Sequence, residues 1–270
     1  MSSDAVPDAR SGRRFEAGEL AKLARSFESE RPESILRWAF EQFGSEQFAL
    51  VSSFQAEAMV LIDMATRIQP DVRIMTIDTG RLPETTQELI DRVRDRYGVR
   101  VEILYPETRL VEAMTTQHGV NLFYREADLR KLCCHVRKVL PLGRALQSVA
   151  AWGTGLRRSQ ATTRANTPKV SLDENNGGIV KVCPLADWSW DDVWQYIRNH
   201  NVPHHPLYDQ GYASIGCAPC TRPTQEGEDA RSGRWWWEEA TTHKECGLHL
   251  AGVKGSIDRE VKTLMAGGEA

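Results

Sequence analysis

The sequence predicts an α/β fold in which a parallel sheet is flanked by helices. Three apolar runs, Phe48 to Val51, Val72 to Ile77 and Val101 to Leu104, have the length of buried strands. An amphipathic helical pattern separates each run from the next, and this alternation is typical of βαβ units. The chain has 270 residues, of which 41% are hydrophobic, so it can bury one sizeable core with an appended lobe.

Helical patterns precede and follow these strands. From Phe15 to Phe43 apolar residues recur mostly at helical spacing, and Arg31-Pro32 interrupts them, which predicts two helices, the second ending at Gly44. The polar stretch from Arg157 to Gly178 has little periodicity and is interpreted as a long mobile loop. The other expected elements are helices over 59–66, 83–97, 136–146, 190–200 and 257–265, an apolar run over 148–152 and a strand over 179–182.

Composition excludes several classes of protein. The chain has 34 Lys plus Arg and 37 Asp plus Glu, a formal net charge of −3, so nothing global indicates a nucleic-acid or membrane-surface partner. No apolar run reaches the roughly 20 residues that cross a bilayer, and the opening residues lack the apolar stretch of a secretion signal, so we expect a cytoplasmic protein. Six cysteines are too few for a disulfide scaffold, and we interpret them first as ligands or nucleophiles.

Two predicted strands end in small polar turns. The first runs into Ser52-Ser53-Phe54-Gln55, where backbone N–H groups and hydroxyls can hold a phosphate at the start of a helix. The second ends at Asp78, whose carboxylate can accept from a ribose or a base, and ligands of parallel sheets collect at such strand ends. Short motifs of this kind also occur as purely structural turns, and the first lacks the Gly-Lys-Ser/Thr ending of a P-loop.

Four cysteines form two pairs. Cys133 and Cys134 are adjacent, and Cys217 and Cys220 have Cys-x-x-Cys spacing, so four thiolates are available for one zinc ion or one iron–sulfur cluster. Adjacent side chains must diverge to occupy two corners of a tetrahedron, which a cluster of separated iron atoms permits more readily than one zinc ion. The adjacency therefore favours a 4Fe–4S cluster. The alternatives are buried thiols that only pack and a disulfide between the adjacent pair.

The two other cysteines have different surroundings. Cys246 lies near the C-terminus beside Gly247, with Lys244 and His249 as nearby groups that favour a thiolate, and it is either a nucleophile or an incidental surface thiol. Cys183 lies in an apolar run and is assigned to the core.

Basic residues cluster near these candidate ligand segments. Arginine makes forked contacts with phosphate or sulfate oxygens, and lysine acts as a point charge, so the clustering favours an anionic substrate over ordinary solvated charges. The residues concerned are Arg137, Lys138, Arg157, Arg158, Arg164, Arg231 and Arg234.

Taken together, these segments resemble the assimilatory adenylyl-sulfate reductases, thioredoxin-dependent enzymes of the adenosine nucleotide alpha-hydrolase-like fold. The resemblance spans about Phe48 to His249. It is carried by the segments 52–57, 77–82, Cys133-Cys134-His135-Val136-Arg137-Lys138, Thr154-Gly155-Leu156-Arg157-Arg158, Gly216-Cys217-Ala218-Pro219-Cys220-Thr221, Gly233-Arg234-Trp235-Trp236-Trp237 and Glu245-Cys246-Gly247-Leu248-His249. One departure is Ala58, where relatives usually carry an acidic residue.

The resemblance implies roles for individual residues. Cys133, Cys134, Cys217 and Cys220 would ligate the 4Fe–4S cluster, and Cys246 would be the catalytic nucleophile on a mobile C-terminal tail. Lys138 would act between cluster and sulfate. The positions at which the family contacts substrate are Ser52, Ser53, Gln55, Asp78, Gly80, Arg157, Arg231 and Arg234. The implied organisation is an N-terminal helical segment over 1–44, a nucleotide-binding α/β domain over 45–200, and a cluster-ligating loop and catalytic tail over 201–270 within the same overall domain.

The implied reaction is reduction of adenylyl sulfate to sulfite and AMP in assimilatory sulfate reduction and cysteine biosynthesis. The Cys246 thiolate attacks the sulfate sulfur, expels AMP and forms an S-sulfonate, which thioredoxin or glutaredoxin then discharges. The only Cys-x-x-Cys is assigned to metal, so the reducing thiols must come from outside the chain. The family also implies a homo-oligomer.

Two other functions compete with this interpretation. The first is reduction of 3′-phosphoadenylyl sulfate, alone or beside adenylyl sulfate; relatives restricted to that substrate generally lack the cysteine pairs. The second is a non-catalytic, zinc-stabilised RNA-binding module with Trp and Arg residues at its surface. The acidic net charge disfavours this module, because nucleic-acid binders generally show a basic footprint.

Overall fold

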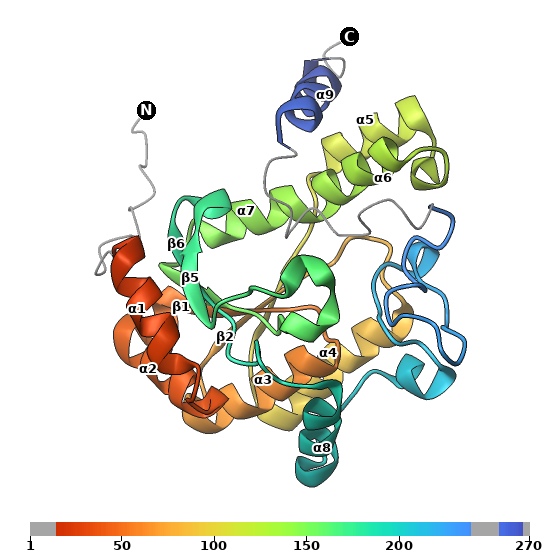
Figure 1. Ribbon diagram of the computed structural model, residues 1–270. Coiled ribbons are helices and arrows are strands. Elements are labelled where there is room, and N and C mark those ends of the chain that lie inside the picture. Colours follow the sequence, from red (N-terminus) through yellow and green to blue (C-terminus); the bar gives the residue numbers. More distant parts are fainter. Residues whose placement is uncertain (1–14, 239–253, 267–270) are drawn as a thin grey trace. The chain divides into compact units, whose positions relative to one another are not determined.

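The computed structural model describes residues 15–238 and 254–266 (Figure 1). The described residues fall into two compact units, a first unit within 1–75, 91–102 and 145–203 and a second unit within 76–90, 103–144 and 204–270. The strands are β1 (Phe48–Ser52), β2 (Arg73–Ile77), β3 (Val101–Leu104), β4 (Ala151–Gly153), β5 (Val170–Asp173) and β6 (Ile179–Val182). The helices are α1 (Ala17–Phe27), α2 (Pro32–Gln47), α3 (Ala56–Ile68), α4 (Glu84–Tyr97), α5 (Thr108–His118), α6 (Ala127–Cys134), α7 (Leu140–Leu146), α8 (Trp190–His200) and α9 (Lys254–Ala266).

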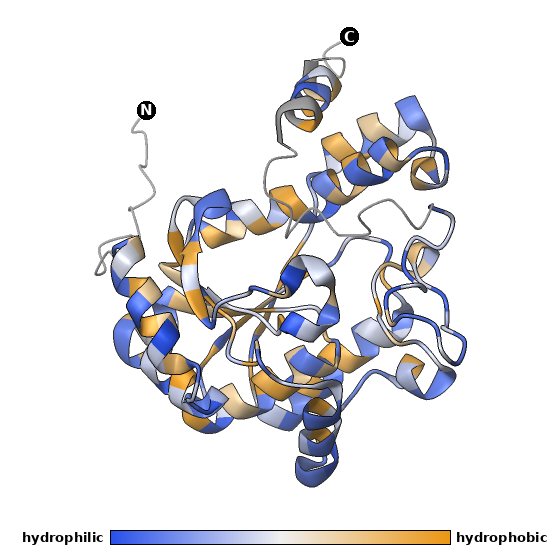
Figure 2. Cartoon of the chain, in the orientation of Figure 1, coloured by the Kyte–Doolittle hydropathy of each residue, from blue (hydrophilic) through white to orange (hydrophobic). Residues whose placement is uncertain are grey.

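The predicted parallel-core sheet is confirmed. Its strand order is β3-β2-β1-β4-β6-β5, and β4 pairs in parallel with both β1 and β6. Phe48, Ala49 and Leu50 of β1 are at most 2% exposed, as expected for a strand covered on both faces. Figure 2 shows the strands as predominantly apolar and the helices as mixed, which is the pattern of a sheet inside a layer of helices.

One part of the sheet differs from the prediction. The interpretation of 157–178 as a long mobile loop is wrong, because β5 lies inside it and pairs antiparallel with β6, with Val170 opposite Val182. Short 3-10 turns over Arg158–Gln160 and Thr162–Arg164 order its beginning. The segment Val-Ser-Leu-Asp has no strong local strand signal, and its backbone hydrogen bonds come from β6.

The helices of the first unit confirm the early predictions. Pro32 begins α2, and Gly44 has a positive φ of 68° inside it, so the helix kinks where its end was predicted and continues to Gln47. In this unit α1 packs against β5, α2 and α3 pack against β1, and α8 packs against α3 (Figure 1). Ser189 caps α8 by accepting from the backbone N–H of Asp192.

The second unit contains helices that periodicity did not reveal. Neither α5 nor α6 was expected, whereas the predicted helix over 136–146 is present as a π-helix over His135–Val139 followed by α7. Leu110 and Met114 of α5 share a buried cluster with Val261 and Leu264 of α9, and the same cluster includes Cys133 and Trp235. The apolar core of this unit therefore extends directly to the cysteines.

Candidate cysteine site and nucleotide loops

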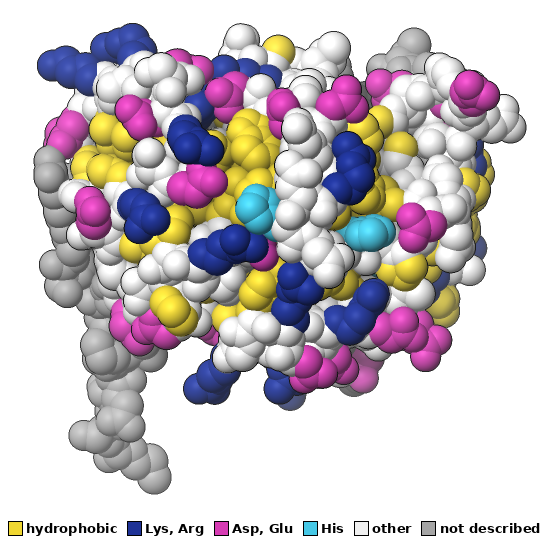
Figure 3. All heavy atoms as spheres, turned by 90° about the horizontal axis from the view of Figure 1, so that it is seen from below, with side chains coloured by type: hydrophobic (Ala, Val, Ile, Leu, Met, Phe, Trp, Pro, Cys, Tyr) yellow, Lys and Arg dark blue, Asp and Glu magenta, His cyan; other side chains and the backbone are white. Residues whose placement is uncertain are grey.

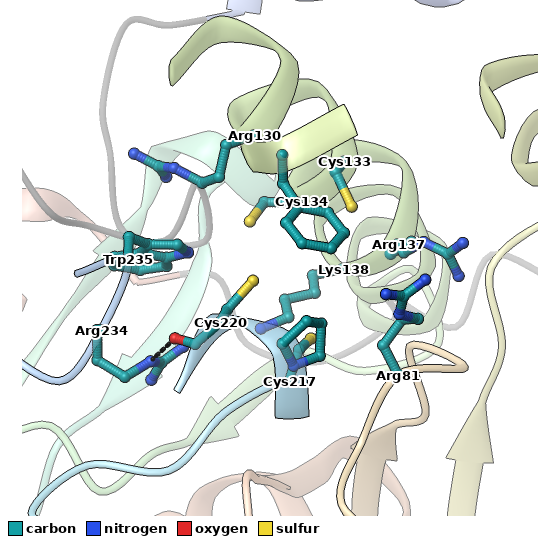
Figure 4. Close-up of a pocket in the computed structure, with 12 residues that line it drawn as sticks. Arg81, Arg130, Cys133, Cys134, Arg137, Lys138, Cys217, Cys220, Arg234 and Trp235 are labelled. Carbon is teal, nitrogen blue, oxygen red and sulfur yellow. Dashed lines mark hydrogen bonds between the residues drawn. The ribbon is translucent and has the colours of Figure 1, made fainter. Parts of the chain in front are cut away.

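The four paired cysteines lie together in the second unit. Cys133 and Cys134 end α6, while Cys217 and Cys220 lie at the two ends of a short turn over 217–220. None of these four cysteines takes part in a disulfide, and each is between 7% and 9% exposed. Figure 4 shows their side chains around one enclosed space, a cavity of about 20 Å³. The two pairs, some 80 residues apart in sequence (134 to 217), thus line a single site.

Backbone contacts hold the second pair in place. The N–H of Ala218 donates to the carbonyl of Arg81 at 2.8 Å, and the hydroxyl of Tyr124 donates to the carbonyl of Pro219 at 2.8 Å. Gly216 precedes the pair, and a Cβ there would lie 2.1 Å from Nη2 of Arg234. Only glycine leaves room for this buried guanidinium, which is 5% exposed.

Basic side chains surround the cavity. Arg81, Arg130, Arg137, Lys138 and Arg234 line it together with the cysteines (Figure 4). Fixed partners orient three of them. Arg130 makes a forked contact with Glu238 at 2.8 and 3.1 Å, Arg137 donates to the Thr79 carbonyl at 2.6 Å, and Arg234 donates to the Cys220 carbonyl at 3.3 Å.

Two of the four thiols have raised pKa values. Burial raises the pKa of Cys220 to about 12, with repulsion from Cys217 as the next cause and Lys138 acting in the opposite direction. Burial also raises the pKa of Cys133, while Arg137 opposes that shift. Burial thus disfavours the thiolate form of Cys133 and Cys220, and nearby positive charge opposes that effect.

Within the described residues the four sulfurs do not form a ready ligand set for a single metal ion. Four sulfurs bound tetrahedrally to zinc at about 2.3 Å lie roughly 3.8 Å apart. Among the described residues, no three Cys, His, Asp or Glu side chains come close enough to hold one metal ion. Two hydrogen-bond donors line this site. The Thr79 hydroxyl lies 3.3 Å from Sγ of Cys217, and the buried Nε1 of Trp235 has no hydrogen-bond partner within the described residues. N–H and O–H donors toward sulfur are typical of iron–sulfur sites.

The first predicted nucleotide loop belongs to the first unit. Oγ of Ser52 accepts from the backbone N–H of Phe54 at 3.0 Å, Oγ of Ser53 accepts from the Gln55 amide at 3.1 Å, and Phe54 has a φ of 55°. The turn leads into α3, and the first N–H groups of a helix can hold an anion bound at its start.

The second predicted nucleotide loop belongs to the second unit. Oδ1 of Asp78 accepts from the N–H of Gly80 at 2.8 Å, and Gly80 has a φ of 69°, so glycine is required there. Asp78 is 8% exposed and keeps its second oxygen near the Gln87 amide at 3.4 Å.

Arg157 is engaged in the first unit. Its Nε and Nη2 each lie 2.9 Å from Oε1 of Glu57, Nη1 donates to Ser159, and the guanidinium lies over the ring of Trp190. This buried ion pair connects the turn after β4 to the start of α3. Its Glu57 lies two residues after Gln55 in the predicted nucleotide loop. Its role toward substrate stays a prediction.

The other predicted residues lie as follows. Arg231 and Arg234 lie over the ring of Trp235, at 5.8 and 4.8 Å, and Lys138 faces the cysteine cavity (Figure 4). Cys246 lies outside the described residues. Cys183 is confirmed as a core thiol at 1% exposure, and burial raises its pKa to about 11.

Sequence reasoning missed three residues of the cavity. Arg130 precedes the cysteine pair by three and four residues, so helical spacing alone could have placed it on their face. Arg81 directly follows Gly80, yet its reach toward the cysteines depends on the contact with Ala218. Trp235 was quoted only as part of the motif over 233–237, and the structure places it both in the core and at the cavity wall.

Solved structures show which fold class the chain belongs to. The chain resembles a phosphoadenylyl-sulfate reductase from Candida auris, solved as a phosphate complex, with a TM-score of 0.67, 29% identity, and coverage of 78% of this chain and 100% of that one. A Candida glabrata FMN adenylyltransferase, with a TM-score of 0.51 and 15% identity, shares the fold alone. The nucleotide-binding α/β fold predicted from the sequence is confirmed.

Comparison with sequences defines the family. Residues 47–223 match the model of the phosphoadenosine phosphosulfate reductase domain, and the chain belongs to this family. It is 46% identical over 224 residues to the adenosine 5′-phosphosulfate reductase of Burkholderia cepacia, covering 83% of this chain and 88% of that protein. It is 48% identical over 204 residues to the protein of the same name from Allochromatium vinosum, covering 76% and 79%. The resemblance drawn from the motifs is confirmed.

Two further observations bear on the partners. On the face drawn in Figure 3, basic and acidic side chains are interspersed rather than gathered into one basic patch. None of the described helices combines the length and the apolar character needed to cross a membrane.

Proposed function

We propose that this chain reduces adenylyl sulfate to sulfite and AMP, with thioredoxin or glutaredoxin as the thiol donor. The observation that carries the proposal is the convergence of four buried cysteines, none of them in a disulfide, on one cavity lined by basic side chains. Membership of the reductase family and relatives named adenosine 5′-phosphosulfate reductase support the same substrate. The cysteine pairs favour adenylyl sulfate over its 3′-phosphorylated form.

The four cysteines would hold a 4Fe–4S cluster. Bound there, the cluster supplies a compact charge beside the substrate site and tunes the adjoining cations. Arg81, Arg130, Arg137 and Lys138 frame the cavity and balance the charge of the thiolates.

The chain's own residues carry out the first chemical step. The Cys246 thiolate attacks the sulfur of adenylyl sulfate, an S–S bond forms, and the S–O bond to AMP breaks with its electron pair leaving on the phosphate oxygen. Thiolate and sulfate are both anionic, so Lys138, Arg231 and Arg234 are assigned to the sulfuryl oxygens. The turns at Ser52, Ser53 and Gln55 and at Asp78 and Gly80, with Arg157, are assigned to the nucleotide.

The second step needs the partner protein. A thioredoxin thiolate attacks Sγ of Cys246, the S–S bond of the sulfonate breaks, and sulfite departs with that electron pair. The second thioredoxin thiol resolves the mixed disulfide, so thioredoxin leaves oxidised and Cys246 leaves as a thiolate. The electrons come from the dithiol and not from the iron.

The reaction itself tests the proposal. Anaerobically purified protein with adenylyl sulfate and reduced thioredoxin should release sulfite and AMP in equal amounts, and 3′-phosphoadenylyl sulfate should turn over more slowly. Equal or faster use of the 3′-phosphorylated nucleotide would assign the chain to the rival substrate.

Two substitutions test the assigned residues. Cys246→Ser should keep its iron and bind AMP but form no S-sulfonate, as seen by mass spectrometry of quenched enzyme. Lys138→Ala should lower turnover more than AMP affinity, whereas Lys131→Ala, an exposed lysine of α6 paired with Asp128, should change neither. Normal turnover in Cys246→Ser contradicts the mechanism.

Iron analysis tests the cluster. Wild-type protein should contain iron and acid-labile sulfide, and Cys220→Ser should lose both. Cys183→Ser is the matched control, a buried cysteine of the first unit that should retain them. Stoichiometric zinc in their place, with neither nucleotide consumed, would revive the binding-module alternative.

A further inference from the structure

The second unit exposes an apolar patch beside the cysteine cavity. Val120 is 61% exposed, Tyr124 is 42% exposed and Trp236 is 40% exposed. The rings of Tyr124 and Trp236 lie 6.2 Å apart, and Val120 lies four residues before Tyr124 on the segment that follows α5. We call Val120, Tyr124 and Trp236 the exposed apolar patch. Large apolar side chains grouped at a surface mark interaction sites more often than isolated ones do.

Contacts with neighbouring aromatic rings and a hydrogen bond hold Tyr124 of the patch in place. The Tyr124 ring packs on Phe123 at 4.7 Å and on Trp237 at 4.5 Å, and its hydroxyl donates to the carbonyl of Pro219 between two of the cysteines. Nε1 of Trp237 donates to the carbonyl of Phe123 at 3.0 Å. Aromatic side chains fixed in this way bind a partner with little further loss of conformational freedom.

Both ends of the segment that carries Cys246 are anchored next to this patch. Glu238, two residues after Trp236, forms a buried ion pair with Arg130. At the other end, Glu260 of α9 contacts His118 at 3.2 Å, two residues before Val120. Cys246 lies eight residues after Glu238, so an extended chain keeps the two Cα atoms within about 28 Å.

We propose that the exposed apolar patch is the docking surface for thioredoxin. This inference rests on the proposed function, because the donor thiol must reach Sγ of Cys246, and any protein that does so must approach the second unit where that segment is anchored. The aromatic side chains of Tyr124 and Trp236 are of the kind enriched at protein interfaces. On this proposal the patch acts only after the S-sulfonate has formed, because it serves to bind the donor protein.

The test separates docking from chemistry by using two donors. The enzyme is first converted to its Cys246 S-sulfonate with adenylyl sulfate, and its discharge is then followed with reduced thioredoxin or with dithiothreitol. Trp236→Ala and Val120→Asp should each lower the second-order rate constant with thioredoxin by about tenfold or more, as expected for an interface anchor. Discharge by dithiothreitol and formation of the S-sulfonate should match the wild type. Tyr105→Ala, an exposed aromatic of the same unit at 55% exposure, is the matched control and should change neither rate.

Three results would overturn the docking surface. The first is a normal thioredoxin rate in both variants, and the second is an equal loss with both donors, which indicates a structural effect. The third is a change of solution mass in either variant, which makes the patch an interface between copies of this chain. A wild-type enzyme that forms no S-sulfonate refutes the proposed function itself, and the docking surface with it.

Discussion

The buried ion pair between Glu57 and Arg157 should stabilise the first unit strongly. The two side chains are 8% and 6% exposed, and Oε1 of Glu57 receives two Arg157 nitrogens and the Gln160 amide, all at 2.9 Å. Removing one partner of such a pair strands a charge away from water, which typically costs about 3–5 kcal/mol. We therefore expect Glu57→Gln and Arg157→Met each to lower the free energy of unfolding by about 3 kcal/mol, or roughly a hundredfold in the folding equilibrium.

A double-mutant cycle measures whether the two residues act as a pair. The double variant should lose about 4 kcal/mol rather than 6, because the second substitution removes the stranded charge, which corresponds to a coupling of about 2 kcal/mol. Equilibrium unfolding in urea, followed by far-UV circular dichroism, gives each value. Asp91→Asn is the surface control, since its pair with Arg94 has side chains 73% and 55% exposed and should cost below about 0.5 kcal/mol. Losses that simply add would refute the pairing.

The same variants decide what Arg157 does for the substrate. Glu57→Gln leaves the guanidinium in place, whereas Arg157→Met removes it. A loss of AMP affinity in Arg157→Met that is absent from Glu57→Gln assigns the guanidinium to the nucleotide. Equal behaviour assigns it to supporting the loop at Ser52 and Gln55.

Other buried contacts give further predictions. Burial, followed by interactions with the Asp63 carboxylate, raises the pKa of Tyr97 and Tyr196 above the ordinary value of 10. The stability that these two side chains confer is therefore present below pH 10 and should be lost as the pH rises beyond it. Spectrophotometric titration of the folded protein checks this, and tyrosines that all titrate near pH 10 would contradict it. Asp63→Asn should lower the free energy of unfolding by about 2 kcal/mol, because both hydroxyls and Arg67 lose a charged acceptor, and an unchanged urea midpoint would disprove this. Gly155→Ala should reduce the melting temperature, since its Cβ would lie 2.8 Å from Cβ of Glu57, whereas Gly18→Ala in α1 has open space and should stabilise the protein by about 0.5 kcal/mol; equal effects in calorimetry would contradict the reasoning.

Local signals were sufficient for the buried elements of the first unit. The strands β1 and β2 and the helices α3 and α8 bury most of their apolar residues against a continuous core, so their patterns persist in the sequence. By contrast β5 is an edge strand that pairs with β6 alone in the sheet. Helix α5 buries only Leu110 and Met114, and their partners lie on α9, about 150 residues later in the chain (114 to 261). Elements stabilised by distant segments leave little local trace.

At the cysteine site, too, some residues could be predicted from neighbouring sequence and others only from contacts in the folded chain. The grouping of Cys133-Cys134 with Cys217 and Cys220 was predicted because the two pairs together supply four thiolates, and the family resemblance implied the same set. The surrounding cations divide differently. Arg137, Lys138 and Arg234 were named from the sequence, whereas Arg81 was not, and the hydrogen bond from the N–H of Ala218 to its carbonyl places it beside the cysteines. Such contacts depend on the folded chain.

The backbone at the adjacent cysteines explains how one helix supplies both thiols and a cation. In a regular α-helix successive residues are about 100° apart, so Cys133 and Lys138, five positions apart, would face directions roughly 140° apart. The helix changes to a π-helix at His135, whose i to i+5 hydrogen bonds bring residues five apart toward the same face. Cys133, Cys134 and Lys138 consequently all line the cavity (Figure 4). The wide turn thus brings Lys138 toward the face of the helix that carries the two cysteines.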